Sequence, residues 1–279
     1  MDLDHLTHVA PLLLWGWLLA AVVMLAVWLV ELARRDATLV DVAWTLNLGF
    51  LAVLYAVVTG VEAHASTAEV ASGSNARRVA VAVLVSAWSL RLASHLVVDR
   101  VIGKPEDGRY RTLRQSWGAN AHRNFLVFFQ AQALLDVVLS LPFLLIVANP
   151  SRDVGAIEWL AVAVWSIAFV GESVADRQLA RFKRDPASKG RTCRVGLWNY
   201  SRHPNYFFEW LHWVAYALAA SAAPFGALAW SAPAIMLFLL FKVTGIPATE
   251  AHAVASRGQD YVDYQRTTSA FVPWFKKGT

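Results

Sequence analysis

Charged residues are scarce in this sequence. Only 16% of its 279 residues are Asp, Glu, Lys or Arg, whereas a soluble domain carries about 25%. Apolar residues make up 57% of the chain, and 13 of the residues are Trp, a side chain that suits the membrane interface. The composition therefore argues against an ordinary soluble domain and predicts a chain whose solvent is mostly lipid.

Cysteine and the common soluble-enzyme motifs are also scarce. Cys193 has no second cysteine to pair with, and its basic neighbours predict a lowered thiol pKa; we interpret it as an incidental thiol in a cytoplasmic loop. The sequence lacks a G-x-G-x-x-G turn after a strand, a Walker A loop and an H-E-x-x-H helix. Its eight His residues are widely scattered, so we predict no metal site. The net charge of +5 is explained by membrane topology, so we predict no nucleic-acid partner.

Long apolar runs are what the sequence does have. About 20 apolar residues cross a bilayer as a helix. We identify seven such runs, at residues 9–32, 38–60, 78–98, 124–148, 156–176, 206–222 and 225–246. Pro142, Pro233 and Pro247 lie in or near these runs, where they are expected to kink or end helices. The sequence therefore predicts an all-α, polytopic membrane bundle of seven transmembrane helices, formed as a single domain over residues 1–279.

The basic residues are distributed unevenly between the two sides of this bundle. Four segments on one side, residues 33–37, 99–123, 177–205 and the C-terminal tail, hold 20 of the 25 Lys and Arg residues, and the opposite side holds three. Cytoplasmic loops carry the excess of positive charge. We therefore predict an outside N-terminus and a cytoplasmic C-terminus, with the first helix retained because residues 1–8 lack the basic start of a signal peptide.

Polar side chains occur inside the predicted spans, toward their cytoplasmic ends. A charged side chain at the centre of a bilayer costs about 2.5–3.5 kcal/mol on insertion scales. Arg91, His95 and Asp99 share one helix face by their spacing, and other ionisable groups lie at the same depth on other spans. We infer one polar cavity that opens to the cytoplasm; the alternative is a set of snorkelling or interhelical hydrogen-bonding residues. Asp136 stands alone in mid-span and is interpreted as structural.

The chemistry of this predicted cavity is mixed. The loops 99–123 and 177–205 hold six and eight basic residues, which suit phosphates, although the topology alone also explains them. Carboxylates nearby do not suit phosphates, but they suit ribose hydroxyls, an adenine amino group or a nicotinamide amide. The combination favours a nucleotide-bearing cofactor.

Residues 196–210, GLWNYSRHPNYFFEW, carry the most recognisable pattern in the chain. The element L-W-x-Y-S-R-H-P-N-Y-x-x-E resembles the C-terminal domain of the membrane steroid 5-alpha-reductase family, and its bacterial members in particular. The segments 88–100, 103–110 and 261–275 are similar to other parts of that family. An R-H-P-x-Y element followed by a downstream Glu is also similar to isoprenylcysteine carboxyl and phospholipid methyltransferases.

The resemblance implies that two parts of the chain bind different ligands, the substrate and a cofactor. It implies substrate-side helices in residues 1–123 and NADPH held by residues 124–279. By position, the cofactor-binding residues implied are Arg91, His95, Arg100, Lys104, Asp176, Lys183, Arg191, Arg202, His203, Asn205, Tyr206, Glu209 and Glu250. Arg202, His203 and Tyr206 stand where animal reductases have small residues.

The implied reaction is the NADPH-dependent reduction of a conjugated enone, such as a 3-oxo-Δ4-steroid, in a lipophilic substrate that enters from the bilayer. Animal members use a Gln-Glu pair and a Tyr, for which Val40-Asp41 and Trp88 are the nearest matches here. We nominate Asp41, held protonated by burial, as the donor to the carbonyl oxygen, with the indole of Trp88 or Trp44 assisting.

Two other functions remain open from the sequence. One is an S-adenosylmethionine-dependent membrane methyltransferase, whose cofactor has no phosphates and less need of the basic loops. The other is a non-catalytic lipid-binding or transport protein, which would favour repeats or broken half-helices. The expected location is the bacterial inner membrane, with the cofactor site facing the cytoplasm. The exact substrate, the preference for NADPH over NADH and the oligomeric state stay open.

Overall fold

A computed structural model describes residues 3–65, 74–243 and 245–276. These residues are predominantly helical and form no named strand; two of them, Ser201 and Ser269, pair in an isolated β-bridge. The chain divides into two compact units. Unit 1 comprises residues 1–154 and 222–228, and unit 2 comprises residues 155–221 and 229–279. The first boundary between the units therefore lies after residue 154, beyond α5 (Ala121–Leu139) and α6 (Leu141–Val147).

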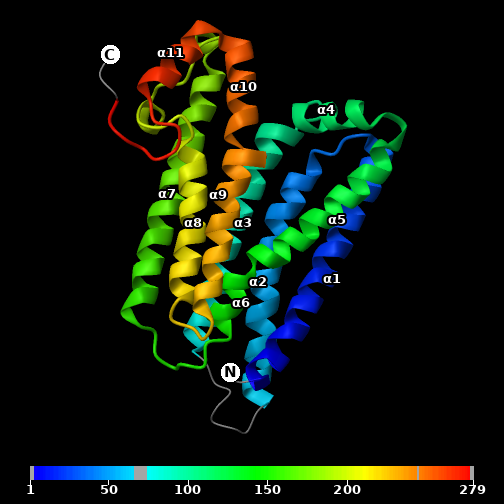
Figure 1. Cartoon of the computed structure of the whole chain (residues 1–279), viewed down its shortest axis with the longest axis vertical. Coiled ribbons are helices and arrows are strands. Elements are labelled where there is room, and N and C mark those ends of the chain that lie inside the picture. The colour runs from blue at the N-terminus through cyan, green and yellow to red at the C-terminus, as the bar shows by residue number, and fades with distance from the viewer. Residues whose placement is uncertain (1–2, 66–73, 244, 277–279) are drawn as a thin grey trace. The chain divides into compact units, whose positions relative to one another are not determined.

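Unit 1 is built on three helices that lie side by side in Figure 1, namely α1 (Leu3–Arg34), α2 (Leu39–Ala65) and α5 (Ala121–Leu139). The α3 helix (Asn75–Leu96) packs against α2. Phe125 and Phe129 of α5 are fully buried against Met24 of α1 and Val40 of α2. Because α5 fills the space between α1 and α2, it belongs with the N-terminal helices rather than with the C-terminal part of the chain.

Long apolar helices occur in both units. Six helices in the described part of the chain are long and apolar enough to cross a membrane, at Ala10–Arg34, Leu39–Val61, Asn75–Val101, Gly108–Val147, Ala156–Arg184 and Gly226–Arg257. Their outward faces expose large apolar side chains, such as Leu14 and Trp15 of α1 and Ile167 of α7. A helix with apolar side chains on its exposed face requires lipid rather than water around it. The prediction of an integral membrane protein with transmembrane helices is confirmed.

Two contacts fix the packing of α2: a close approach to α3 and a buried polar pair with α5. At Gly49 of α2, a Cβ atom would lie 2.7 Å from Oγ of Ser89 on α3, so only glycine permits this contact. Asn47 donates a 2.9 Å hydrogen bond to Asp136 of α5, and both side chains are fully buried. An amide that pairs with a buried carboxyl group ties α2 to α5, which is the structural role expected for Asp136.

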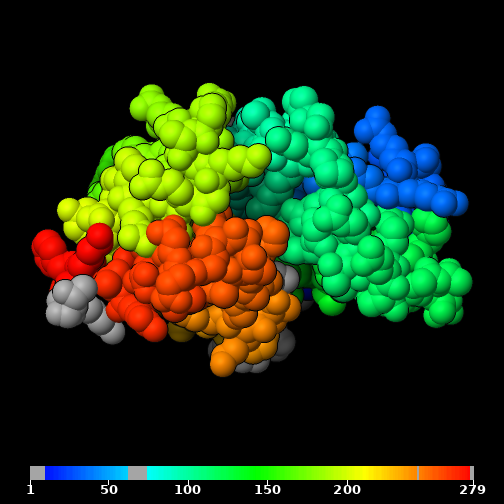
Figure 2. Space-filling view, turned by 90° about the horizontal axis from the view of Figure 1, so that it is seen from above, coloured from blue at the N-terminus to red at the C-terminus, as the bar shows by residue number. Residues whose placement is uncertain are grey.

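The predicted loop 99–123 is largely helical, which corrects that expectation. The α3 helix continues as a π-helix over Val97–Val101, and α4 (Gly108–Trp117) follows, with Asp107 as an N-cap that accepts from the Arg109 amide. Figure 2 shows this segment covering one end of unit 1. The α4 sequence, GRYRTLRQSW, has only a short apolar stripe, Tyr110, Leu113 and Trp117, which packs against the core of unit 1. Its other positions are mostly polar or basic, so the sequence reads as a loop.

Unit 2 is built on α7 (Ala156–Arg184), α8 (Pro204–Ala220) and α9 (Ser231–Phe238), which run side by side in Figure 1. A Cβ atom on Gly171 of α7 would lie 2.4 Å from the ring of Phe208, so this glycine lets α8 approach closely. A π-helix (Leu239–Val243), α10 (Ile246–Arg257) and α11 (Gln259–Thr267) complete the unit.

Prolines mark the helix boundaries in both units. The first turn of α6 (Leu141–Val147) contains Pro142, and the first turn of α10 contains Pro247. Pro233 lies near the start of α9. The first helical turn tolerates proline because its N–H has no intrahelical partner. These residues were expected to kink or end helices, and the structure places them at or near helix starts, where they separate one helix from the next.

Candidate functional site

The predicted site residues divide between the two units. In unit 1 lie Asp41, Trp44, Trp88, Arg91, His95, Arg100 and Lys104. In unit 2 lie Asp176, Lys183, Arg191, Arg202, His203, Asn205, Tyr206, Glu209 and Glu250. The polar clusters of each unit are described separately.

Asp41, in the first turn of α2, is the centre of the cluster in unit 1. Its Oδ2 accepts hydrogen bonds from Nη1 of Arg100 at 2.7 Å and from Nη2 of Arg109 at 2.6 Å. Its Oδ1 accepts a hydrogen bond from the hydroxyl of Tyr110, which is buried. The π-helix at the end of α3 presents Arg100, and the start of α4 presents the other two donors. Three elements thus converge on one carboxylate.

Both oxygens of Asp41 accept hydrogen bonds, from Arg100, Arg109 and Tyr110. In the structure Asp41 therefore positions these three donors. The expected role of Asp41 as the donor to a substrate carbonyl oxygen stays a prediction.

A second cluster lies beside the first and was not predicted. Arg114 of α4 donates to Glu31 of α1 at 2.7 Å and to Glu106 at 2.7 and 3.1 Å. Nδ1 of His122 lies 3.0 Å from both oxygens of Glu31, which is fully buried. Glu106 also accepts from the backbone N–H of Ala37, between α1 and α2. The signal that sequence reasoning passed over is an acidic residue, Glu31, within the last turns of an apolar span.

The side chains of the other predicted residues of unit 1 are buried to different extents. Trp88 is fully buried on α3, and Trp44 is half-buried against the core of α1, α2 and α5. Arg91 and His95 are half-buried on α3, and Lys104 is exposed. The two tryptophans thus contribute to packing, which gives them a structural role whatever their part in chemistry.

Asp107 makes the stability of this end of unit 1 sensitive to pH. Burial tends to raise the pKa of its carboxyl group, but hydrogen bonds and charge from Arg109, the Arg109 amide and the charge of Arg100 outweigh this, so the pKa is lowered. A lowered folded-state pKa contributes stability above the unfolded value, about 3.9, and that stability is lost as pH falls through the folded value. We expect the melting temperature of the native protein in detergent to exceed that of Asp107→Asn at pH 6, and the difference to shrink as the pH falls below about 3.9. A difference that does not change as the pH falls would contradict this.

In unit 2, the R-H-P-N-Y element packs against α10 and α11. Arg202 donates through Nε to Glu250 at 2.6 Å and through Nη1 to the carbonyl oxygens of Gln265 and Thr268 at 2.9 and 2.7 Å. Nε2 of His203 lies 3.1 Å from the same Glu250 oxygen, and Gln265 donates to the other oxygen at 2.8 Å. Figure 2 shows the segment before α8 alongside α10. The motif and the downstream acid, 47 and 48 residues apart, therefore form one cluster.

The rest of the motif extends this cluster along α8. The rings of His203 and Tyr206 stack with centroids 5.3 Å apart, and the Tyr206 hydroxyl lies 3.3 Å from Oγ1 of Thr249. Asn205 donates a long, 3.4 Å hydrogen bond to Asp176 of α7, which is buried. The structure therefore brings the predicted residues Asp176, Asn205, His203 and Tyr206 to neighbouring elements of one unit.

Deeper in unit 2 lies a buried pair that the list of predicted cofactor residues did not include. Nε2 of His212 on α8 lies 3.4 Å from Oε2 of Glu172 on α7, and both residues are buried. Trp165 donates a 3.0 Å hydrogen bond to the hydroxyl of Tyr216 on the same two helices. The predicted residue Glu209 accepts a 3.4 Å hydrogen bond from Trp213, one turn further along α8. Polar contacts thus run along the whole α7–α8 interface.

Lys183 and Arg191, the predicted phosphate ligands of unit 2, are exposed. Lys183 lies in the last turn of α7, and Arg191 lies in the segment between α7 and α8. Asp260 of α11 holds that segment, because it accepts hydrogen bonds from the Thr192 amide at 2.7 Å and from Arg194 at 2.9 Å. The segment therefore has a defined position next to α11.

Cys193 is buried in this segment, which corrects the expectation of a lowered thiol pKa. Burial raises the pKa of the thiol, and the Val195 amide and the charge of Arg257 lower it by less. Because the thiolate is the reactive species, we expect the native protein to react with a maleimide at least about tenfold more slowly than the protein unfolded in detergent. Equal rates in the two states would show that the thiol is accessible and would contradict the burial.

Acidic residues of the clusters already pair with arginines, which limits the ligands that these arginines can bind. Asp41 and Glu250 already pair with Arg100 and Arg202, two of the arginines predicted to bind cofactor. Lys104 of unit 1 and Lys183 and Arg191 of unit 2 are exposed basic residues. Among the described residues, no group of three His, Cys, Asp or Glu side chains is arranged to hold a metal ion.

Comparison with known proteins places the chain in a family. A family described as "Protein of unknown function (DUF1295)" matches residues 27–268. An uncharacterized protein of Schizosaccharomyces pombe is 28% identical over 177 residues, which cover 56% of this chain and 52% of that protein. The chain thus matches about half the length of this curated relative. No solved structure matches the chain significantly. Since the match covers most of the chain, the chain belongs to the DUF1295 family, which includes steroid 5-alpha-reductase-like membrane proteins.

Proposed function

We propose that this protein is an NADPH-dependent membrane reductase that saturates the C=C bond of a conjugated enone in a lipophilic substrate, with a 3-oxo-Δ4-steroid as the best candidate. The observation that carries the proposal is the cluster in which Arg202 and His203 of the R-H-P-N-Y element meet Glu250. Membership of a family with steroid 5-alpha-reductase-like members supports it.

The proposed topology has seven spans, an outside N-terminus and a cytoplasmic C-terminus. Six candidate spans correspond to six of the predicted runs. The remaining run corresponds to α8, which has 17 residues, at the lower end of the range that crosses a bilayer. The excess of Lys and Arg on one side supports the orientation. In a bacterial inner membrane, the Arg202 cluster would then face the cytoplasm, where NADPH is available.

The donor set in unit 2 fits a dinucleotide. The amide of Asn205 and the carboxylates of Asp176 and Glu209 suit hydroxyl and amide groups, and the basic side chains of Lys183 and Arg191 suit phosphates. Asp176 and Asn205 lie on neighbouring helices, joined by a hydrogen bond. These residues would hold the cofactor, and the Arg202–Glu250 pair would order the segment from which Asn205 projects.

The chemistry is a hydride transfer followed by a proton transfer. NADPH, when bound, supplies a hydride to the β-carbon of the enone; the substrate's carbonyl oxygen then gains negative charge, and a proton from water completes the saturated ketone at the α-carbon. A donor aimed at that oxygen lowers the barrier by about 3–4 kcal/mol. In unit 1, the guanidinium groups of Arg100 and Arg109 are suited to this role because Asp41 holds both in place. Asp41 is then a positioning residue.

One observation favours the methyltransferase alternative. The pairing of Arg100 with Asp41 and of Arg202 with Glu250 removes two of the predicted phosphate ligands. S-adenosylmethionine has no phosphates, so a neutralised cluster would suit it. The exposed Lys183 and Arg191 argue for the dinucleotide instead, and direct binding separates the two cofactors.

The deciding experiment measures binding of NADPH and S-adenosylmethionine to the full chain in nanodiscs. We expect NADPH to bind, and Arg191→Ala to weaken it about tenfold, because one charge-assisted hydrogen bond contributes about 1.5–3 kcal/mol and 1.4 kcal/mol is a factor of ten. Arg123→Ala, an exposed arginine of unit 1, is the matched control and should leave the affinity unchanged. Binding of S-adenosylmethionine without binding of NADPH would overturn the proposal.

A further inference from the structure

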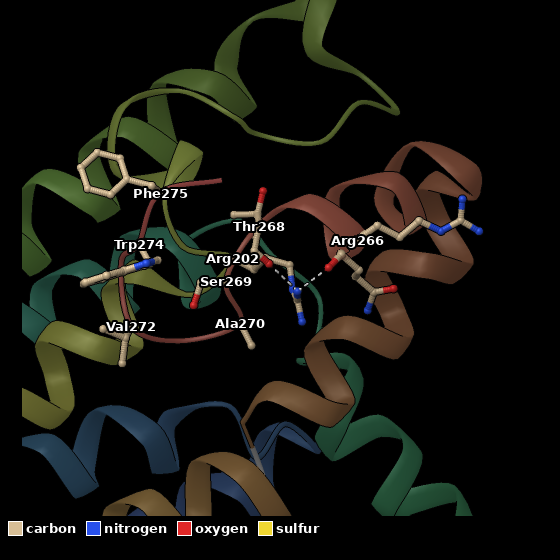
Figure 3. A pocket seen from close by; sticks show the side chains of 9 residues that line it. Arg202, Arg266, Thr268, Ser269, Ala270, Val272, Trp274 and Phe275 are labelled. Atoms are coloured by element: carbon tan, nitrogen blue, oxygen red, sulfur yellow. Dashed lines mark hydrogen bonds between the residues drawn. The ribbon is translucent and has the colours of Figure 1, made fainter. Parts of the chain in front are cut away.

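A groove of about 420 Å³ lies in unit 2, beside the segment that follows α11. It is lined by Arg202, Gln265, Arg266, Thr268, Ser269, Ala270, Val272, Trp274 and Phe275. Figure 3 shows the polar residues at one end of the groove and Val272, Trp274 and Phe275 at the other. A groove with one polar and one apolar end suits an amphiphilic ligand, and its volume lies in the range of small-molecule sites.

The apolar end of the groove is built on a fixed backbone. The Arg202 amide donates to the Ser269 carbonyl at 2.9 Å, the Ser201 hydroxyl donates to the Phe271 carbonyl at 2.7 Å, and the Trp274 amide donates to the Tyr200 carbonyl at 3.0 Å. The segment 269–274 is therefore held along residues 200–202, just before α8. These hydrogen bonds fix the backbone of the segment and therefore the positions from which its side chains project.

One face of this segment packs inward against a candidate membrane span. The ring of Phe271 lies 5.2 Å from that of Phe241, in the π-helix of the span Gly226–Arg257, and 5.6 and 5.8 Å from those of Phe207 and Trp210. Phe271 itself is buried. The segment 269–274 is thus anchored beside the candidate membrane span Gly226–Arg257.

The opposite face leaves three apolar side chains exposed. Val272 is 49% exposed, Trp274 68% and Phe275 76%. Large apolar side chains so close together on one surface indicate an interaction site rather than a water-facing segment. Tryptophan and phenylalanine next to a span suit the membrane interface, where an apolar ring meets the lipid headgroups.

The polar end of the groove is basic. Arg266 is highly exposed, with its Nη1 3.6 Å from Asp263, and so keeps most of its guanidinium toward solvent. Arg202 reaches the groove from the other side, although its Nε and Nη1 are bound to Glu250 and to backbone carbonyls. The hydroxyl groups of Thr268 and Ser269 add further hydrogen-bonding capacity. A phosphate diester would complement this end.

We propose that this groove, here called the tail groove, binds one anionic phospholipid, with its phosphate at Arg266 and an acyl chain along Val272, Trp274 and Phe275. The tail groove would dock the end of the chain onto the membrane leaflet and hold residues 269–274 against the base of α8. This inference rests on the membrane-spanning class of the protein and not on the proposed reductase activity.

Native mass spectrometry of the full chain tests the proposal. The protein is extracted in a mild detergent and titrated with short-chain phosphatidylglycerol or phosphatidylcholine. We expect one phosphatidylglycerol to be retained, with at least about fivefold weaker retention of phosphatidylcholine and of phosphatidylglycerol by the triple variant Arg266→Gln, Trp274→Ser, Phe275→Ser. The matched control is Arg111→Gln with Trp159→Ser, an exposed basic residue and an exposed aromatic residue of other helices. Equal losses in the control, or displacement of the lipid by millimolar inorganic phosphate, would overturn the proposal.

A second measurement decides the question if the triple variant fails to fold. In a Cys193→Ser background, a fluorophore is attached at Phe275→Cys or, as a control, at Asp263→Cys, which is exposed on α11. In vesicles that contain phosphatidylglycerol, we expect the label at position 275 to be quenched by brominated lipid and the label at position 263 by aqueous iodide. A label at position 275 that iodide quenches as strongly as the control would show a water-facing tail and contradict the proposal.

Discussion

Replacement of Arg202 by alanine is expected to loosen the end of unit 2 and to abolish cofactor binding. The change removes three hydrogen bonds at once, to Glu250 and to the carbonyls of Gln265 and Thr268. Glu250 would keep its contacts with His203 and Gln265 but would lose its charged partner. Removing one partner of a buried ion pair costs about 3–5 kcal/mol, and the Arg202 and Glu250 side chains are only 12% and 15% exposed. We therefore expect a loss of about 3 kcal/mol, measured by thermal unfolding in detergent.

The role of the pair in binding can be separated from its role in stability by a double-mutant cycle. Arg202→Ala, Glu250→Gln and the double variant are compared in unfolding and in NADPH affinity. If the two side chains act as one unit, the double variant should be little worse than Arg202→Ala alone, because the Glu250→Gln change leaves no unpaired charge at that position. Strictly additive losses would show that Arg202 and Glu250 act independently, which the 2.6 Å contact argues against.

The membrane-spanning helices were predictable from the sequence because their signal is local. A run of about 20 apolar residues identifies a span without knowledge of its neighbours, and prolines such as Pro142 and Pro247 mark helix boundaries because the first helical turn tolerates them. The R-H-P-N-Y element was likewise visible as a pattern. Its contact with Glu250, 48 residues from Arg202, was not predicted and comes from the structure.

The features that were missed depend on contacts between distant residues. Asp41 meets Arg100 and Arg109, which are 59 and 68 residues away. Without these partners the sequence gives no sign that Asp41 joins α2 to two other elements. The α4 helix was missed for a similar reason, since its short apolar stripe, Tyr110, Leu113 and Trp117, is accompanied by ionic contacts with distant residues of α1 and α2.

The π-helices show a further limit of sequence reasoning. A single-turn π-helix at Val97–Val101 ends α3 and contains Asp99 and Arg100. A regular α-helical spacing assumes about 3.6 residues per turn and so misplaces side chains beyond such a turn. Because π-turns are associated with functional sites, the one that presents Arg100 to Asp41 supports a role for this cluster beyond packing.

Replacement of Arg114 by alanine is expected to be the most disruptive single change in unit 1. Its guanidinium pairs with Glu31 and Glu106 and lies 4.8 Å from the ring of Phe125. Without it, the fully buried Glu31 would keep His122 but no arginine among its described partners. We expect a loss of about 3 kcal/mol, at the low end for a broken buried pair because Arg114 is itself 20% exposed. Thermal unfolding in detergent measures the loss.

The matched control for this prediction lies one turn earlier on the same helix. Arg111 is exposed on α4, so Arg111→Ala should change stability by less than about 0.5 kcal/mol.

A second test adds Glu31→Gln to Arg114→Ala. Because the added change removes the buried charge left without its arginine, the double variant should be more stable than Arg114→Ala alone. If Arg114→Ala behaves like Arg111→Ala, α4 is held by its other contacts and the ionic cluster does not stabilise unit 1. If the double variant is the less stable one, the harm comes from lost packing against Phe125 rather than from an unpaired carboxylate.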